Sequence, residues 1–170
     1  VAGRRGGYCF EHNTLFGAVL EAVGFTVQTL EARVRPLGAT RTLPRTHMVL
    51  RVDVDGRTVL ADVGFGGDGP VGPVDFDGSP TDQGLDVYRI ADEDRSKVLQ
   101  IRRDSHWQDL YAFGLEPALS VDFEVANHYT STYPGSPFTQ NLTVQRSVNG
   151  ERRILRHRTL SIRTAAGTDV

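Results

Sequence analysis

Apolar residues near the start of the chain recur at helical spacing. Between residues 10 and 23, apolar side chains return every three or four positions, at Leu15, Phe16, Val19, Leu20 and Val23. This spacing is typical of an amphipathic helix, and we expect these side chains to form its buried face. Gly24 follows and favours the end of the helix. Cys9 stands where the predicted helix begins.

The pattern then changes to that of strands. Residues 25–34 alternate between apolar and polar, and residues 48–54 and 58–63 do so on either side of Asp55-Gly56. This dipeptide is typical of a tight hairpin turn. Residues 36–44 and the Gly- and Pro-rich residues 64–73 are predicted loops. Further strands are expected at residues 86–90, 97–102, 107–113, 139–145 and 152–157, a short helix at 121–127, and a second hairpin turn at Asn149-Gly150.

These elements predict the α+β class, with one helix that carries a cysteine packed on a mostly antiparallel sheet or barrel. The chain of 170 residues is long enough for an apolar core, and 39% of its residues are hydrophobic against 24% charged. A net charge of −2 gives no reason to expect nucleic-acid or membrane partners. The densest basic group is expected to be a solvated strand face and comprises Arg152, Arg153, Arg156 and Arg158.

The chain contains one cysteine, so an intramolecular disulfide is impossible. We therefore expect a reducing, cytoplasmic location. No apolar run approaches the length of a membrane-spanning helix, and the first seven residues lack the apolar stretch of a signal peptide.

The predicted hairpin brings a histidine and a carboxylate to one face. With a two-residue turn at positions 55–56, the register counted outward places Val49 opposite Asp62. His47 lies two residues from Val49 along the same strand, so its side chain points to the same side. Such diagonal neighbours lie about 7–8 Å apart at the backbone, within reach of an imidazole and a carboxylate. The opposite face is expected to be core and carries Met48, Leu50, Val52, Val54, Val59, Ala61 and Val63.

Cys9 completes a candidate set for nucleophilic catalysis. A thiol attacks as the thiolate, which the positive end of a helix and a neighbouring imidazolium both favour. Asp62 would orient His47 and stabilise its charged form. Taken singly, each residue also has an ordinary interpretation: a buried apolar cysteine, a structural histidine and a turn-forming aspartate.

The flanking residues resemble a known family. Residues 5–13 read Arg-Gly-Gly-Tyr-Cys-Phe-Glu-His-Asn, which resembles the active-site cysteine motif of the arylamine N-acetyltransferases. Residues 46–48 and 62–67 resemble the histidine and aspartate segments of that family, in the same order. Residues 122–127 and 131–138 resemble the stretch that follows, so the resemblance extends from residue 5 to about residue 146.

The resemblance implies a three-part fold of a helical bundle, a β-barrel and a C-terminal lid, with a core like that of cysteine proteases. In that scheme, residues 1–24 are a remnant of the helical domain, residues 25–146 are the barrel domain, and residues 147–170 begin the lid. Most of the helical bundle and of the lid would then be missing, which puts the activity of this chain in question.

The resemblance also implies a ping-pong reaction. Acetyl-CoA would acylate Cys9, and an arylamine or hydrazine would then take the acetyl group, with His47 as the base and Asp62 as its partner. Acetyl-CoA acts here as a substrate, and neither a tightly bound cofactor nor a metal is expected. By resemblance, the acceptor pocket is lined by Phe65 and Phe138, and the thiol end of CoA lies near Thr46 and Gly66.

Three other functions are compatible with the same residues. A macrolactam-forming or chain-releasing amide synthase of the same family would release or cyclise a polyketide chain from a carrier thioester onto an aromatic amine. A transglutaminase-like or papain-like enzyme would share the triad logic, although the cysteine motif and the segment after Asp62 argue against it. A truncated, inactive remnant or binding module is the non-enzymatic alternative. The acceptor amine, the acyl chain and the oligomeric state stay open.

Overall fold

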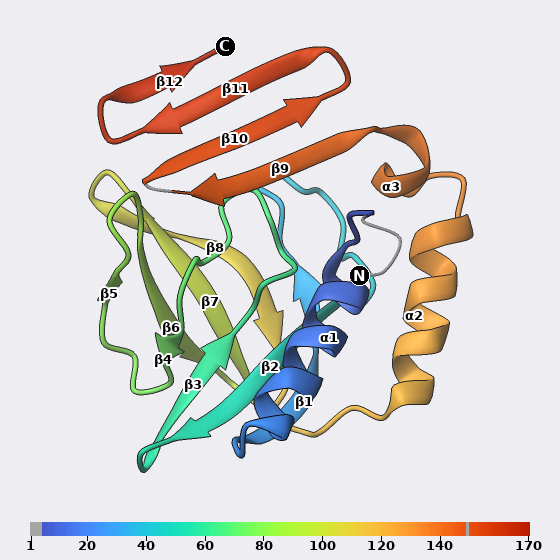
Figure 1. Ribbon diagram of the computed structural model, residues 1–170, viewed down its shortest axis with the longest axis vertical. Coiled ribbons are helices and arrows are strands. Elements are labelled where there is room, and N and C mark those ends of the chain that lie inside the picture. Colours follow the sequence, from blue (N-terminus) through green and yellow to red (C-terminus); the bar gives the residue numbers. More distant parts are fainter. Residues whose placement is uncertain (1–4, 149) are drawn as a thin grey trace.

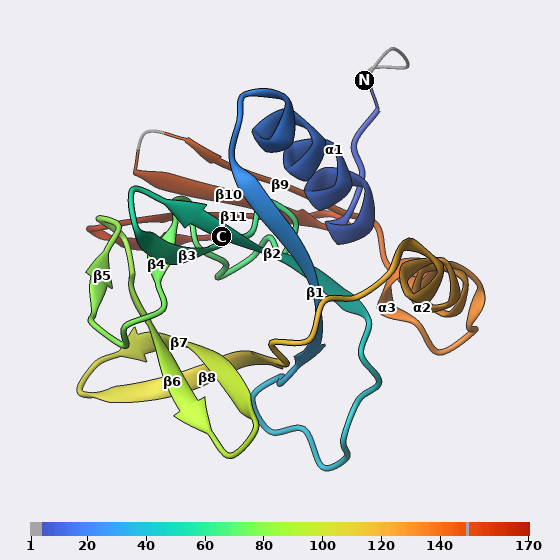
Figure 2. The ribbon, with the colours of Figure 1, turned by 90° about the horizontal axis from the view of Figure 1, so that it is seen from below.

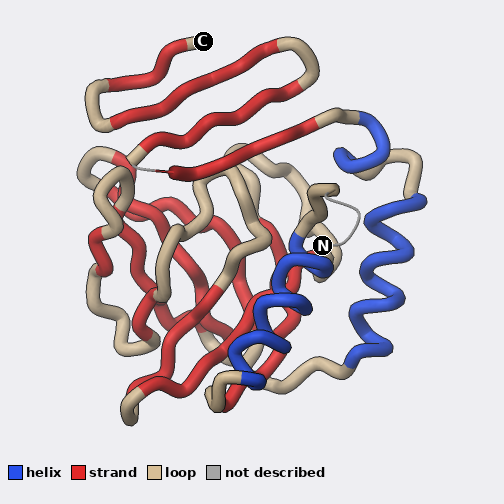
Figure 3. Tube along the Cα trace, in the orientation of Figure 1, coloured by secondary structure: helices blue, strands red, loops and turns tan. Residues whose placement is uncertain are grey.

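The computed structural model describes residues 5–148 and 150–170 and confirms the α+β class. Figure 3 shows the helices and strands along the chain. The first half contains α1 (Cys9–Ala22), β1 (Thr26–Val34), β2 (His47–Val54), β3 (Arg57–Ala61), β4 (Val74–Asp75), β5 (Thr81–Asp82), β6 (Val87–Glu93), β7 (Ser96–Arg103) and β8 (His106–Phe113). The second half contains α2 (Ser120–Thr132), α3 (Pro137–Gln140), β9 (Thr143–Val148), β10 (Glu151–Arg156), β11 (Thr159–Thr164) and β12 (Gly167–Asp169).

Eight strands form one antiparallel sheet in the order β4-β3-β2-β1-β8-β7-β6-β5. The sheet curls into a nearly closed barrel, seen from below in Figure 2. Its interior is filled by side chains that are at most 6% exposed: Leu30, Ala32, Val49, Leu60, Val74, Tyr88, Ile90, Leu99, Ile101, Leu110, Tyr111 and Phe113. Removing this much apolar surface from water is the main stabilising contribution to the barrel.

The β2–β3 hairpin has the predicted register. Val54 pairs with Arg57, and the ladder continues outward to Leu50 and Ala61. Asp55 and Gly56 have φ angles of 50° and 77°, so both turn residues adopt the left-handed conformation that suits the twist of a two-residue hairpin. Both faces of β2 are buried, one in the barrel and one beneath α1, because the helix packs on the outside of the sheet.

The predicted apolar face of α1 is only partly correct. Phe16 and Leu20 pack against the sheet, but Leu15, Val19 and Val23 are 49%, 49% and 67% exposed. The residues of α1 that are buried instead are Cys9, Phe10, Asn13 and Gly17. Gly17 faces the Leu50 and Val27 side chains, and a Cβ atom there would lie at an ordinary contact distance of 3.5 Å from Leu50. Val63 was also expected in the core and is 50% exposed.

The C-terminal region departs furthest from the expected elements. The strand predicted at 139–145 begins instead as the short helix α3, because Ser136 caps it by accepting a hydrogen bond from the Phe138 amide and Pro137 opens its first turn. The strand itself, β9, starts at Thr143.

Other elements also differ from the prediction. Helix α2 extends five residues beyond the predicted end, to Thr132. Four strands were not predicted: β4, β5, β11 and β12.

Strands β9 to β12 form a second antiparallel sheet, which lies over one end of the barrel in Figure 1. Val148 pairs with Glu151, so a two-residue connection joins β9 to β10, although Asn149 of the predicted turn lies outside the described residues. Because this sheet begins at Thr143, it starts within the segment assigned to the barrel domain. The division at residues 24 and 146 stays a prediction.

Arg152 contradicts the expected solvated basic face. Its side chain is buried between the two sheets at 3% exposure, whereas Arg153, Arg156 and Arg158 are exposed. Arg153 points to the opposite side of β10 from Arg152, because neighbouring residues of a strand alternate. Arg156 shares the side of Arg152 but is exposed, since it is the last residue of the strand. Among the residues that the structure describes, no helix is long and apolar enough to span a membrane.

The barrel core should dominate the stability of the fold. We expect Leu99→Ala, which removes a side chain with no exposed surface, to lower the free energy of unfolding by about 2–5 kcal/mol. Leu37→Ala is the matched control, because Leu37 is 83% exposed. Denaturant unfolding would measure both, and equal effects of the two substitutions would contradict the assignment of the core.

Candidate active site

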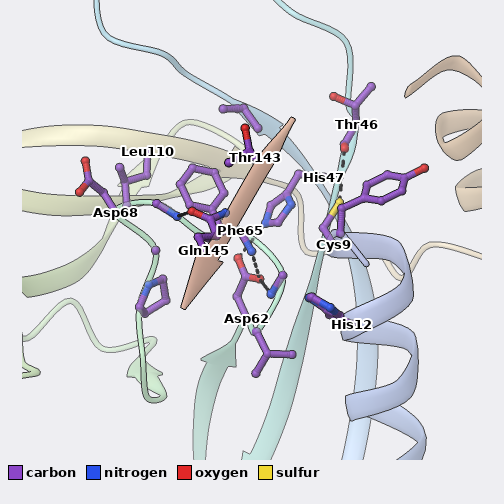
Figure 4. A pocket seen from close by; sticks show the side chains of 18 of the residues that line it. Cys9, His12, Thr46, His47, Asp62, Phe65, Asp68, Leu110, Thr143 and Gln145 are labelled. Carbon is purple, nitrogen blue, oxygen red and sulfur yellow. Dashed lines mark hydrogen bonds and ion pairs between the residues drawn. The ribbon is translucent and has the colours of Figure 1, made fainter. Parts of the chain in front are cut away.

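The structure brings Cys9, His47 and Asp62 together from three separate elements (Figure 4). Cys9 is the first residue of α1, His47 is the first residue of β2, and Asp62 directly follows β3. The Nε2 atom of His47 lies 2.7 Å from Oδ2 of Asp62. Sγ of Cys9 lies 3.7 Å from the carbonyl oxygen of Thr46, the residue directly before His47. All three residues are at most 6% exposed.

The Asp62 carboxylate has partners at both oxygens. Its Oδ1 atom accepts hydrogen bonds from Nδ2 of Asn13 at 2.9 Å and from the amides of Gly64 and Phe65 at 2.9 and 3.1 Å. Its Oδ2 atom accepts from the Tyr111 hydroxyl at 2.9 Å, in addition to the histidine. These bonds compensate for the loss of water around a buried charge.

Asn13 and Tyr111 hold the Asp62 carboxylate, and neither was predicted from the sequence. Asn13 has no exposed surface and also joins the Met48 carbonyl and the Val63 amide, so it ties α1 to β2 and to the loop that follows β3. A signal for Asn13 was available, because it stands four residues after Cys9 on a helix and therefore on the same face.

Tyr111 reaches Asp62 because of an irregularity that an alternating pattern does not reveal. Leu99 pairs with Tyr111, whereas the next residue, Gln100, pairs with Asp109, so Leu110 is an extra residue in β8. This bulge re-aims the strand and lets Leu110 and Tyr111 both contribute to the barrel core.

Electrostatics keep His47 and Asp62 in their charged forms. Burial lowers the pKa of the His47 imidazole, but the charge and hydrogen bond of Asp62, helped by Cys9, raise it to about 10. Burial raises the pKa of Asp62, and the attraction of His47 with the bonds from Asn13 and Gly64 outweighs it, so that pKa lies below its usual value. Burial, together with the charge of Asp62, holds the pKa of Tyr111 well above its usual value, so its hydroxyl remains a donor.

The loop after Asp62 needs glycine for two reasons. A Cβ atom at Gly64 would lie 2.4 Å from Cα of Cys9, so only glycine allows the loop to pass this close to the start of α1. Gly66 and Gly67 have φ angles of 67° and 48°, a left-handed conformation that other residues rarely adopt. The Gly67 amide donates a hydrogen bond to the side chain of Gln145 on β9, which lies against Gly66.

An open cleft of about 2080 Å³ runs beside the thiol. All of the predicted site residues line it: Cys9, Thr46, His47, Asp62, Phe65, Gly66 and Phe138. The Phe65 ring packs 5.2 Å from the His47 ring and 5.0 Å from the Tyr111 ring, measured between ring centres. Phe138 is 58% exposed, and its ring lies 5.0 Å from that of Tyr8. Phe65 therefore also supports the imidazole, whereas Phe138 borders open space.

The fold and its site, a cysteine at the start of a helix beside an ion pair on the adjoining sheet, define the class of protein, and similarity to known families identifies it. A family model described as N-acetyltransferase matches residues 1–170, and the chain belongs to this family. Its relatives are arylamine N-acetyltransferases, as the sequence motifs predicted. The enzyme of Mycolicibacterium smegmatis is 42% identical over 177 residues, which cover 99% of this chain and 63% of the relative. The enzyme of Mycobacterium tuberculosis is 38% identical, with coverage of 99% and 62%.

Solved structures agree with this assignment. The arylamine N-acetyltransferase of Mycobacterium marinum in complex with CoA is 37% identical and superposes with a TM-score of 0.90, covering 98% of this chain and 63% of that one. The Mycolicibacterium smegmatis structure gives a TM-score of 0.92 at 39% identity. The chain thus spans a little under two thirds of the length of these proteins.

The pKa of His47 should depend on Asp62. In Asp62→Asn, burial of the imidazole is no longer opposed by a negative partner, so we expect its pKa to fall from about 10 to near or below the ordinary 6.5. NMR titration of the imidazole would measure this, with Asp53→Asn, on the turn side of the same hairpin, as control. An unchanged His47 titration in Asp62→Asn would contradict the ion pair.

The same shift predicts how stability depends on pH. Because folding raises the pKa of His47, its contribution is fully present below pH 6.5 and is lost as the pH rises through about 10. The lowered pKa of Asp62 adds a second loss, as the pH falls below the usual range of a carboxyl group. Denaturant midpoints measured across pH should show both losses in the unmodified protein, and the alkaline loss should disappear in Asp62→Asn.

The contact between the loop and α1 can be tested at Gly64. We expect Gly64→Ala to lower the free energy of unfolding by about 1–3 kcal/mol, because the new methyl group overlaps Cα of Cys9. Gly114→Ala is the matched control, since nothing lies within 4 Å of a Cβ atom there. If both variants unfold at the same denaturant concentration, the close approach is not a constraint.

Proposed function

We propose that the protein moves an acetyl group from acetyl-CoA to an arylamine or hydrazine through a thioester on Cys9. The observation that carries the proposal is the placement of this thiol at the start of α1, beside a buried His47–Asp62 ion pair. A helix start and an adjacent imidazolium both favour the thiolate, the form that attacks carbonyl carbon. The CoA bound to the Mycobacterium marinum relative supports the choice of donor.

In the first half-reaction, the Cys9 thiolate attacks the carbonyl carbon of acetyl-CoA. A new bond forms between carbon and Sγ, the bond to the CoA sulfur breaks, and the departing CoA thiolate takes a proton from the His47 imidazolium. Asp62 stays ionised throughout and holds the ring in place. The products are acetyl-Cys9 and CoA, with a neutral imidazole.

In the second half-reaction, the acceptor nitrogen attacks the thioester carbon. Neutral His47 accepts the proton that the amine loses, the bond from carbon to Sγ breaks, and the Cys9 thiolate reappears beside an imidazolium. The acetylated amine leaves, and the original charge pair is restored. Atoms and charges therefore balance over the two steps without a further reactant.

The residues of the cleft divide into two groups in this proposal. Phe65 and Phe138 offer aromatic surface near the thiol and would contact a flat aromatic acceptor. Thr46 and Gly66 also line the cleft beside Cys9 and would lie near the thiol end of the donor. Since Phe65 also packs on His47, replacing it should affect the rate of the reaction as well as the binding of the acceptor.

The thioester is open to direct detection. Acetyl-CoA added without an acceptor should increase the mass of the protein by one acetyl group and release one equivalent of CoA, measured by intact mass spectrometry and a thiol assay. Cys9→Ser is the matched control and should retain the fold without a rapid burst of CoA. Absence of loading from acetyl-CoA, with loading from a carrier thioester, would instead support the amide synthase.

A further inference from the structure

A buried ionic cluster outside the triad joins the second sheet to the barrel. Its centre is Asp86, which is 4% exposed and precedes β6. Three guanidinium groups surround this carboxylate: Arg103 of β7 at 2.7 Å, Arg152 of β10 at 3.0 Å and Arg163 of β11 at 2.5 Å. Burial raises the pKa of Asp86, but the bonds from Arg163 and Arg103 outweigh it and lower that pKa below its usual value.

Arg152 extends this cluster to the glycine loop that lines the cleft. Its Nη1 atom donates to the carbonyl of Gly67 at 2.5 Å, and its Nη2 atom donates to the carbonyl of Gly69 at 2.7 Å and to the Tyr88 hydroxyl at 2.6 Å. The Tyr88 hydroxyl in turn lies 2.9 Å from the carbonyl of Asp68. The carbonyls of three successive loop residues, 67 to 69, therefore accept hydrogen bonds from Arg152 of the second sheet or from Tyr88 of β6.

These contacts act on a segment that has little rigidity of its own. The loop contains glycines with left-handed φ angles at 66 and 67, and a backbone bond from the Gly69 amide to the Gly66 carbonyl closes its turn. Glycine-rich backbone loses much conformational freedom when it is ordered. A loop fixed by buried partners has already lost that freedom, so a ligand that binds to it does not have to order it.

Stability alone is a weak reason for such a cluster, because apolar packing often stabilises as well as buried ion pairs do. Its position is more informative. Arg152 and Tyr88 donate hydrogen bonds to the backbone of the loop that starts at Asp62 and borders Cys9, and Asp86 holds the Arg152 side chain. The cluster thus connects two sheets at the point where the cleft is formed.

We propose that Arg152 is a positioning residue for the acyl donor, which it serves by fixing the turn at residues 66–69. The inference rests on the proposed function for the identity of the donor and for its place beside Gly66. An arginine suits the task because its planar fork reaches several acceptors at once, whereas the single ammonium of lysine cannot span the same set. Tyr88 contributes through its hydroxyl, which accepts from Arg152 and donates to the carbonyls of Asp68 and Gly69.

The test compares Arg152→Lys with Arg153→Lys, which changes an exposed arginine next to it on the same strand. In Arg152→Lys we expect the acetyl-CoA concentration that gives half-maximal acylation of Cys9 to rise by about tenfold, which is the effect of losing a charged hydrogen bond. The limiting acylation rate should change by less than about twofold, and so should alkylation of Cys9 by iodoacetamide, which needs no donor site. Tyr88→Phe should change the half-maximal concentration in the same direction.

Hydrogen exchange supplies a readout that does not depend on catalysis. Amides in peptides covering residues 64–69 should exchange faster in Arg152→Lys and not in Arg153→Lys. The proposal is overturned if Arg152→Lys changes neither the acetyl-CoA concentration for half-maximal acylation nor the amide exchange of residues 64–69. A parallel fall in iodoacetamide reactivity and thermal stability would also overturn it, because it would show a general structural role. If the unmodified protein is not acylated by acetyl-CoA, the proposed function fails, and loop exchange alone decides whether Arg152 orders the turn.

Discussion

A carboxylate and an imidazolium buried side by side impose conditions on everything around them. With almost no water in contact, the lone pairs of Asp62 need donors from the protein, and the structure supplies them from α1, from β8 and from the loop that follows. Asn13 meets this need from the same helix that begins at Cys9. The bonds that keep the ion pair charged thus also set the position of the thiol, so the site and its scaffold are one arrangement.

Short-range patterns in the sequence predicted the part of this arrangement that a hairpin determines. The two-residue turn at Asp55-Gly56 has one favoured geometry, and the period of two in a strand then carries the register out to His47. The sequence was less informative where distant segments compete for the same surface. The helix buries Asn13 and Gly17 in place of Leu15 and Val19, because the hydrogen bonds of Asn13 turn that side of the helix toward the hairpin.

The burial of Arg152 could not be predicted from the sequence either. On composition alone, an arginine in a basic strand belongs in water, and its neighbours on β10 are indeed exposed. Its burial depends on Asp86, which lies 66 residues away in the chain, and on carbonyls that face it only when the second sheet covers the barrel. Pairing over such a separation leaves no periodic signal in the sequence.

The β2–β3 hairpin keeps its turn at one end and the ion pair at the other. Side-chain direction along a strand depends on whether a position is odd or even, so insertion of a single residue in either strand would rotate His47 or Asp62 away from its partner. Lengthening both strands equally at the turn preserves that parity. A foreign sequence, such as an epitope or a reporter attachment point, that is inserted at positions 55–56 should therefore leave the directions of the His47 and Asp62 side chains unchanged.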